Sequence, residues 1–196
     1  RTAQASTPAS VSTLTAARYN LALVDLAEGN DAGAEASLRQ VIERDPANAE
    51  AWNHLGLIAH RRERVDEAMS LYARAVEADP AFAPALANWG NACKDMGDLD
   101  RAMQLYERAL AADPQTTGAL VNSASIALER GNLAEARRAA LRALEIRPLL
   151  AEAQYVLGLI QLREQDFEHG WEGYERRFET DPPVASLSPP RRPQLA

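Results

Sequence analysis

Prolines recur along this chain at a fixed spacing, at Pro46, Pro80, Pro114, Pro148 and Pro182. Alanines share the same spacing of 34 residues, at Ala34, Ala68, Ala102 and Ala136. A fixed period of a few tens of residues is the signature of a repeat architecture, in which each unit covers the apolar face of the next. We divide the chain into five repeats, 15–48, 49–82, 83–116, 117–150 and 151–182, and expect disordered segments at 1–14 and 183–196.

Each repeat reads as two helices joined by a tight turn, and the third repeat shows this best. Apolar residues at i, i+3 and i+4 predict a first helix over 84–96 and a second over 99–112. Between them, Gly97 suits the left-handed end of one helix and Asp98 suits the N-cap of the next. Pro114 then ends the second helix, because proline lacks an amide donor.

The composition favours helix and argues against some partners. The chain is 46% hydrophobic, enough for a core of its own. Its net charge of -7 argues against a nucleic acid partner and against docking on an anionic membrane. No apolar run approaches the ~20 residues that cross a bilayer. Lys94 is the only lysine, a bias typical of a GC-rich, bacterial genome. We expect a cytoplasmic protein, or a periplasmic one if a signal peptide was removed upstream of Arg1.

The repeat resembles the tetratricopeptide repeat. The second repeat carries the family's pattern of small and aromatic residues at Trp52, Leu55, Gly56, Ala68, Tyr72, Ala75 and Pro80, and the third at Gly90, Ala102, Tyr106, Ala109 and Pro114. The resemblance covers about residues 15–182. It implies an all-α fold, a right-handed superhelical solenoid of about five helix-turn-helix units that binds a peptide or a protein and acts as a scaffold.

The last repeat departs from this pattern, because Gly170 stands where the small alanine is expected and Trp171 follows it. This variant resembles the end of bacterial repeat arrays that lead into glycosyltransferase-type domains. An alternative function follows: the chain is the substrate-recruiting region of a larger glycosyltransferase-like enzyme. A self-assembling structural array is a third reading. The full-length open reading frame would separate the first alternative from a free-standing scaffold.

A column of carboxamides marks the predicted binding groove. In this family the first helix of each repeat lines a concave surface, and Asn20, His54, Asn88 and Asn122 recur there at the repeat period, with Asn53, Asn91 and Lys94 nearby. A carboxamide both donates and accepts hydrogen bonds, so a ladder of them can hold an extended peptide backbone. The alternative reading is a solvated polar helix face. Cations do not converge in the way that a clamp for C-terminal carboxylates requires.

The second helix of the last repeat carries an aromatic stripe of Phe167, Trp171, Tyr174 and Phe178. Most of the stripe should pack on the first helix of its own repeat. Arrays of this kind usually end in a polar capping helix, and none is evident here. The exposed remainder can therefore dock a following domain or a second copy of the chain, giving a homo-oligomer.

The sequence offers no catalytic site. His54, His60 and His169 lack the spacing of metal ligands, and Cys93, the only cysteine, should be a buried, inert thiol. Neither a phosphate-binding glycine loop nor a convincing strand is present. We predict no enzyme activity, no cofactor and no metal.

Overall fold

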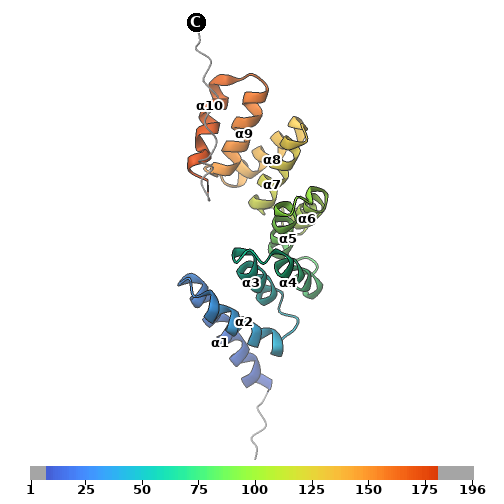
Figure 1. The fold of residues 1–196 in the computed structure, drawn as a ribbon, viewed down its shortest axis with the longest axis vertical. Helices are drawn as coiled ribbons and strands as arrows, with labels where there is room; N and C mark the ends of the chain where they lie inside the picture. Colours follow the sequence, from blue (N-terminus) through green and yellow to red (C-terminus); the bar gives the residue numbers. More distant parts are fainter. Residues whose placement is uncertain (1–7, 181–196) are drawn as a thin grey trace, which may run out of the picture. The chain divides into compact units, whose positions relative to one another are not determined.

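The computed structural model describes residues 8–180, with side chains from residue 13 onward. Its helices, shown in Figure 1, are α1 (Pro8–Ala27), α2 (Asp31–Arg44), α3 (Ala49–Arg61), α4 (Val65–Ala78), α5 (Ala83–Asp95), α6 (Leu99–Ala112), α7 (Thr117–Glu129), α8 (Leu133–Ile146), α9 (Ala151–Arg163) and α10 (Phe167–Glu175), followed by the 3-10 turn η1 (Arg176–Phe178). The described residues contain no strand.

The predicted all-α solenoid architecture is confirmed. In the third repeat the observed helices start at Ala83 and Leu99, within one residue of the expected ranges. We expected the segment 1–14 to be disordered, but its part from residue 8 onward is helical, since α1 begins at Pro8. Proline is tolerated in the first turn of a helix, where its missing amide would be unpaired anyway. Residues 1–7 and the predicted tail at 183–196 lie outside the described residues.

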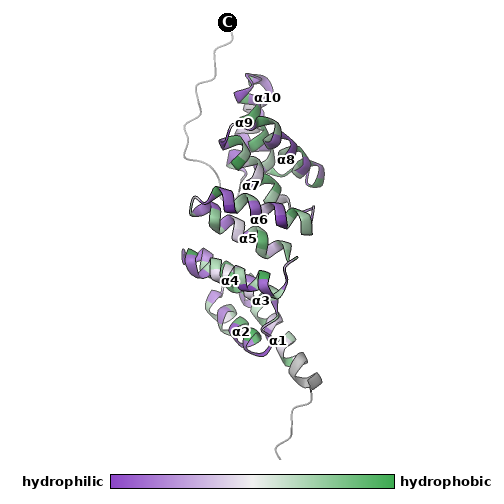
Figure 2. Cartoon of the chain, turned by 90° about the vertical axis from the view of Figure 1, so that its right-hand side faces the viewer, coloured by the Kyte–Doolittle hydropathy of each residue, from purple (hydrophilic) through white to green (hydrophobic). Residues whose placement is uncertain are grey.

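The chain divides into two compact bodies, one running to Thr116 and the other starting at Thr117. In the N-terminal body, α1–α6 form three consecutive hairpins, and in the C-terminal body α7–α10 form two. Every even-numbered helix packs on its own hairpin partner, and α2, α4 and α8 also pack on the odd-numbered helix that follows. Hydrophobic and hydrophilic residues lie on different sides of most helices (Figure 2), as this two-sided packing requires.

The hairpin turns repeat one backbone solution. Gly29, Gly97 and Gly131 adopt left-handed φ angles of 76°, 79° and 78°. Glu63 and Gln165 occupy the same repeat position with φ of 60° and 68°, although a side chain makes this conformation less favourable. The next helix then starts from a capping side chain that accepts a backbone amide, in Asn30, Asp98, Asn132 and Asp166.

Inside the second and third hairpins a tyrosine ring rests against a glycine. A Cβ atom built on Gly56 would lie 2.5 Å from the Tyr72 ring, and one on Gly90 would lie 2.5 Å from the Tyr106 ring. Tyr106 therefore fills the space inside its own hairpin. In the last hairpin the close contact is between backbones, since a Cβ on Gly158 would lie 2.5 Å from the amide nitrogen of Tyr174.

The core runs between hairpins as well as within them. One cluster joins α2 to α3, with Leu38 and Val41 packed on Leu55 and Ile58. A second cluster joins α7, α8 and α9 through Ala124, Ala136, Ala140, Val156 and Ile160. Each hairpin therefore buries an apolar face that it could not cover alone.

Candidate binding faces

The carboxamides of α3 and α5 form a hydrogen bond across neighbouring repeats. Asn88 Nδ2 donates to Asn53 Oδ1 at 2.9 Å. Asn53 is only 4% exposed, whereas Asn88 is half-buried. Asn53 therefore holds Asn88 in place, and Asn88 is the member of the pair that can meet a ligand.

The same spacing recurs in a second contact between α3 and α5 and in one contact between α7 and α9. His60 on α3 contacts Asp95 on α5 at 2.9 Å, and Arg163 on α9 donates to the carbonyl oxygen of Leu128 on α7 at 2.7 Å. All three contacts join residues 35 positions apart, which is one period plus one residue. Facing odd helices are thus offset by one residue relative to the repeat.

His54 lies between α1 and α3 against an aromatic ring. Its imidazole centroid is 5.9 Å from that of Tyr19. Burial lowers the pKa of His54, the nearby Arg61 cation lowers it further, and Glu50 opposes both effects. Asn20, the next residue along α1, is exposed.

Asn91, the last of the predicted groove carboxamides in the N-terminal body, forms a hydrogen bond inside its own hairpin. The Tyr106 hydroxyl donates a hydrogen bond to Asn91 Oδ1 at 2.9 Å. Lys94, one turn further along α5, is half-buried. The pairing of Asn91 with a buried tyrosine was not evident from the carboxamide column, because the column gives a spacing and not a direction.

The C-terminal body has a groove between α7 and α9 with a volume of about 510 Å³. Its apolar lining comes mainly from Val121, Leu128, Val156 and Leu159, and Tyr155 adds an aromatic ring. Its polar residues are Asn122, Ser125, Glu129, Glu152, Arg163 and Thr180. The structure thus places Asn122 in a concave site, but the residues that line this site with it include no other asparagine. Tyr155 and the acidic residues of this groove were not among the residues singled out from the sequence.

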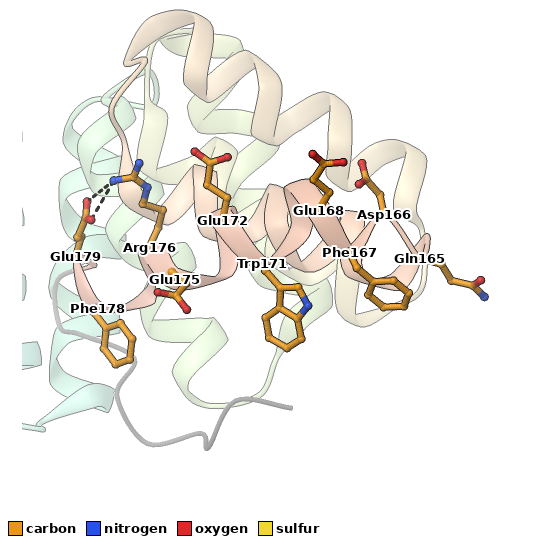
Figure 3. Close-up of a pocket in the computed structure, with 10 residues that line it drawn as sticks. All are labelled: Gln165, Asp166, Phe167, Glu168, Trp171, Glu172, Glu175, Arg176, Phe178 and Glu179. Carbon is orange, nitrogen blue, oxygen red and sulfur yellow. Dashed lines mark hydrogen bonds and ion pairs between the residues drawn. The ribbon is translucent and has the colours of Figure 1, made fainter. Parts of the chain in front are cut away.

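The aromatic stripe of α10 is split between interior and surface. Tyr174 is 4% exposed and packs on Tyr155 with ring centroids 5.8 Å apart. Phe167 and Phe178 are 42% and 53% exposed, and Trp171 is half-buried. Figure 3 shows these three side chains pointing to the same side of the helix, away from the acidic Glu168 and Glu172.

Of the residues considered above for chemistry, His169 pairs with a carboxylate and Cys93 is buried. His169 contacts the Asp166 carboxylate at 3.0 Å, which raises the pKa of His169. Cys93 is 1% exposed, and burial raises the pKa of its thiol. Over the same residues, no group of three His, Cys, Asp or Glu side chains could hold a metal ion, and no helix is long and apolar enough to cross a membrane.

Stacked helical hairpins that share a continuous core define the class of α-helical repeat proteins. The sequence model of the tetratricopeptide repeat matches residues 19–81, 88–151 and 124–169. The chain therefore belongs to the tetratricopeptide repeat family, as the resemblance implied.

Solved structures show the same fold at low sequence identity. The pilF protein of Pseudomonas aeruginosa is 20% identical, with a TM-score of 0.76 over 85% of this chain and 76% of that one. A MamA protein is 20% identical, with a TM-score of 0.68 over 90% and 98% of the two chains. YrrB, described as a TPR protein with an unusual peptide-binding site, is 20% identical, with a TM-score of 0.63 over 85% and 86%. Among curated proteins, none matches this chain in sequence.

Proposed function

We propose that this protein is a non-catalytic interaction module that binds an extended segment of a partner protein in the groove between α7 and α9. The observation that carries the proposal is the groove itself, which is concave, mostly apolar and bordered by a few polar side chains. Sites of this make-up are typical of ligand recognition, because the apolar floor supplies affinity and the polar groups fix orientation.

The residues of the groove suggest what the bound segment looks like. An apolar side chain of the partner would rest on Val156 and Leu159, beside the ring of Tyr155. Asn122 provides a carboxamide, which can hydrogen-bond to a peptide backbone as donor and acceptor. Glu129 and Glu152 favour a basic residue nearby. Arg163 is held by the Leu128 carbonyl and acts as part of the wall.

In the N-terminal body, the α3/α5 face offers a second contact of the same kind. Asn88 is held by Asn53 and so presents its carboxamide with little loss of side-chain freedom on binding. His54 continues this face along α3, and Asn20 continues it onto α1. Asn53 and Asn91 are positioning residues in this proposal, since one holds Asn88 and the other receives the Tyr106 hydroxyl.

YrrB, a fold relative described as having an unusual peptide-binding site, supports the proposal at the level of the fold. At 20% identity that likeness concerns the fold, so the site proposed for this chain depends on its own residues.

A peptide-display selection on the purified protein tests the proposal. Peptides enriched on the wild type should carry an apolar residue near a basic one. Their affinity, measured by fluorescence anisotropy, should fall about tenfold in Asn122→Ala and at least as much in Tyr155→Ala, since a lost hydrogen bond or apolar contact is worth roughly 1–2 kcal/mol. Arg138→Ala, on the exposed side of α8, is the matched control and should bind normally. Equal binding by all four proteins would overturn the proposal.

A further inference from the structure

The first helix exposes an apolar stripe on the side that faces away from its hairpin. Leu14, Leu21 and Val24 are 45%, 54% and 53% exposed, and Ala17 between them is also exposed. Their spacing of i, i+3, i+7 and i+10 places them on one face. The opposite face of α1 is packed, through Tyr19, Ala22 and Leu26. We call the four exposed residues the α1 stacking face.

In the other odd-numbered helices the corresponding face is buried. One period after Ala17, Leu21 and Val24 stand Ala51, Leu55 and Ile58, which are at most 3% exposed and pack on α2. Four periods after Ala17 and Val24 stand Ala153 and Ile160, both 0% exposed. Ile160 packs with Ala136 and Ala140 of α8. This is therefore the face that an odd helix turns toward the even helix before it.

The last helix exposes the other half of the same interface. We call Phe167 and Trp171 of α10, together with Phe178 of η1, the α10 aromatic face; Figure 3 shows all three pointing to the same side. Three periods earlier, α4 carries Val65, Met69 and Val76. Val65 and Met69 pack in a cluster that includes Ala92 of α5, and Val76 is 8% exposed. An even helix thus uses these positions to hold the odd helix that follows it.

We propose that the α10 aromatic face of one molecule binds the α1 stacking face of a second copy, head to tail, in the way that successive repeats pack within each body. The chain carries both halves of an interface that it already forms internally, between α2 and α3, α4 and α5, and α8 and α9. The two halves differ from each other, so the contact is heterologous and can add further copies.

Charge favours this arrangement over a pairing of two α10 faces. Four glutamates, Glu168, Glu172, Glu175 and Glu179, line the same pocket as the α10 aromatic face, and Figure 3 shows Glu175 pointing to the aromatic side. Two such faces would bring like charges together, which disfavours association. The first turn of α1 contains no acidic residue, and its described stripe is flanked by Arg18 and, at its C-terminal end, by Asp25, whose carboxylate accepts a hydrogen bond from Asn30. The α1 stacking face therefore meets α10 with less repulsion than a second α10 face would.

Sedimentation velocity over a range of concentrations tests the proposal, which does not rest on the peptide-binding function. The wild type should form larger species as its concentration rises. Leu21→Glu and Trp171→Glu should each sediment as monomers, because each places a carboxylate in one apolar half of the interface. Glutamate is a good helix former, so the second variant should keep its helix. Circular dichroism checks the fold of both variants.

The decisive sample is an equimolar mixture of the two variants. Leu21→Glu keeps its α10 face and Trp171→Glu keeps its α1 face, so the mixture should form a 1:1 dimer that grows no further. Ala16→Glu adds the same charge to α1 at the position of Glu50 and Glu152, outside the stripe, and should associate like the wild type. A monomeric wild type, self-association of Leu21→Glu alone, or a mixture that stays monomeric would each overturn the proposal.

Discussion

The Tyr106 hydroxyl donates a 2.9 Å hydrogen bond to Asn91, inside the hairpin of the third repeat. The preceding repeat places Tyr72 at the same position, but its hydroxyl is buried without a hydrogen-bond partner. The reason lies one period before Asn91, where Leu57 offers no polar atom. Two tyrosines in the same packing position, both 0% exposed, therefore differ in how their hydroxyls are satisfied.

This difference predicts opposite effects of the same substitution. Tyr106→Phe should lower the free energy of unfolding by about 1 kcal/mol, because the half-buried Asn91 loses its donor. Tyr72→Phe should leave it unchanged or raise it, since a buried hydroxyl without a partner is removed. Urea denaturation followed by circular dichroism measures both. Equal destabilisation by the two substitutions would contradict the assignment.

The glycines beneath the tyrosine rings should resist replacement. Gly90→Ala should destabilise the protein by roughly 1–3 kcal/mol, because the new methyl group overlaps the Tyr106 ring. Gly158→Ala should cost more, since it meets the backbone of Gly173 and Tyr174, which cannot rotate away. Gly118→Ala, on α7 with open space around it, is the control and should stabilise by about 0.5–1 kcal/mol. Thermal unfolding of the three variants gives the order, and a destabilised control would count against this packing argument.

The turn of the second repeat contains backbone strain at Glu63 that a single substitution can remove. Glu63 adopts a φ of 60° where the first, third and fourth repeats have glycine. Glu63→Gly should therefore raise the midpoint of thermal unfolding, by an amount that corresponds to about 1 kcal/mol. Gly97→Ala introduces the reverse change at the equivalent position and should lower the midpoint by a similar amount. If both variants move the midpoint in the same direction, the turn conformation is not the cause.

Acid should weaken the fold through His54. Because burial, followed by Arg61, lowers its pKa, the unfolded chain binds a proton at His54 more readily than the folded one. Its contribution to stability is present above about 6.5, the ordinary pKa of histidine, and is lost as the pH falls through the lowered pKa of the folded state. His54→Gln should therefore flatten the decline in unfolding midpoint between neutral and mildly acidic pH.

His169 is the control, because its pKa is shifted the other way. The hydrogen bond to Asp166 raises it, so its contribution is present below 6.5 and is lost as the pH rises through the folded pKa. His169→Gln should steepen the decline on acidification. Identical pH profiles for the wild type and His54→Gln would contradict the burial of His54.

Local chemistry explains why the helices and turns were predictable. Gly97 and Asp98 stand at the turn positions that the 34-residue period identifies, and the helices on either side follow from apolar spacing. The same period could not reveal that facing odd helices are offset by one residue, as in the pair Asn53 and Asn88. That offset is set by how the helices pack, so it appears only in three dimensions.

The proposed binding site was predictable only in part, for the same reason. The carboxamide column indicates that the odd-numbered helices carry the proposed site. Within it, however, Asn53 is buried and Asn91 accepts a hydrogen bond from the Tyr106 hydroxyl. Tyr155 lies outside that column. Its place in the proposed site could not be predicted, because it depends on the space that opens between α7 and α9. A spacing gives the helix on which a side chain lies, and the neighbouring helix decides what that side chain can reach.

Hydrogen–deuterium exchange with and without a display-selected peptide tests the central claim most directly. Binding in the groove should slow amide exchange in α7 and α9, while α8 keeps its rate apart from the turns that join it to them. The Tyr155→Ala variant should show no such protection at the same peptide concentration. Protection confined to α8 and α10, or protection that persists unchanged in Tyr155→Ala, would contradict the assignment of the odd-helix face as the binding surface.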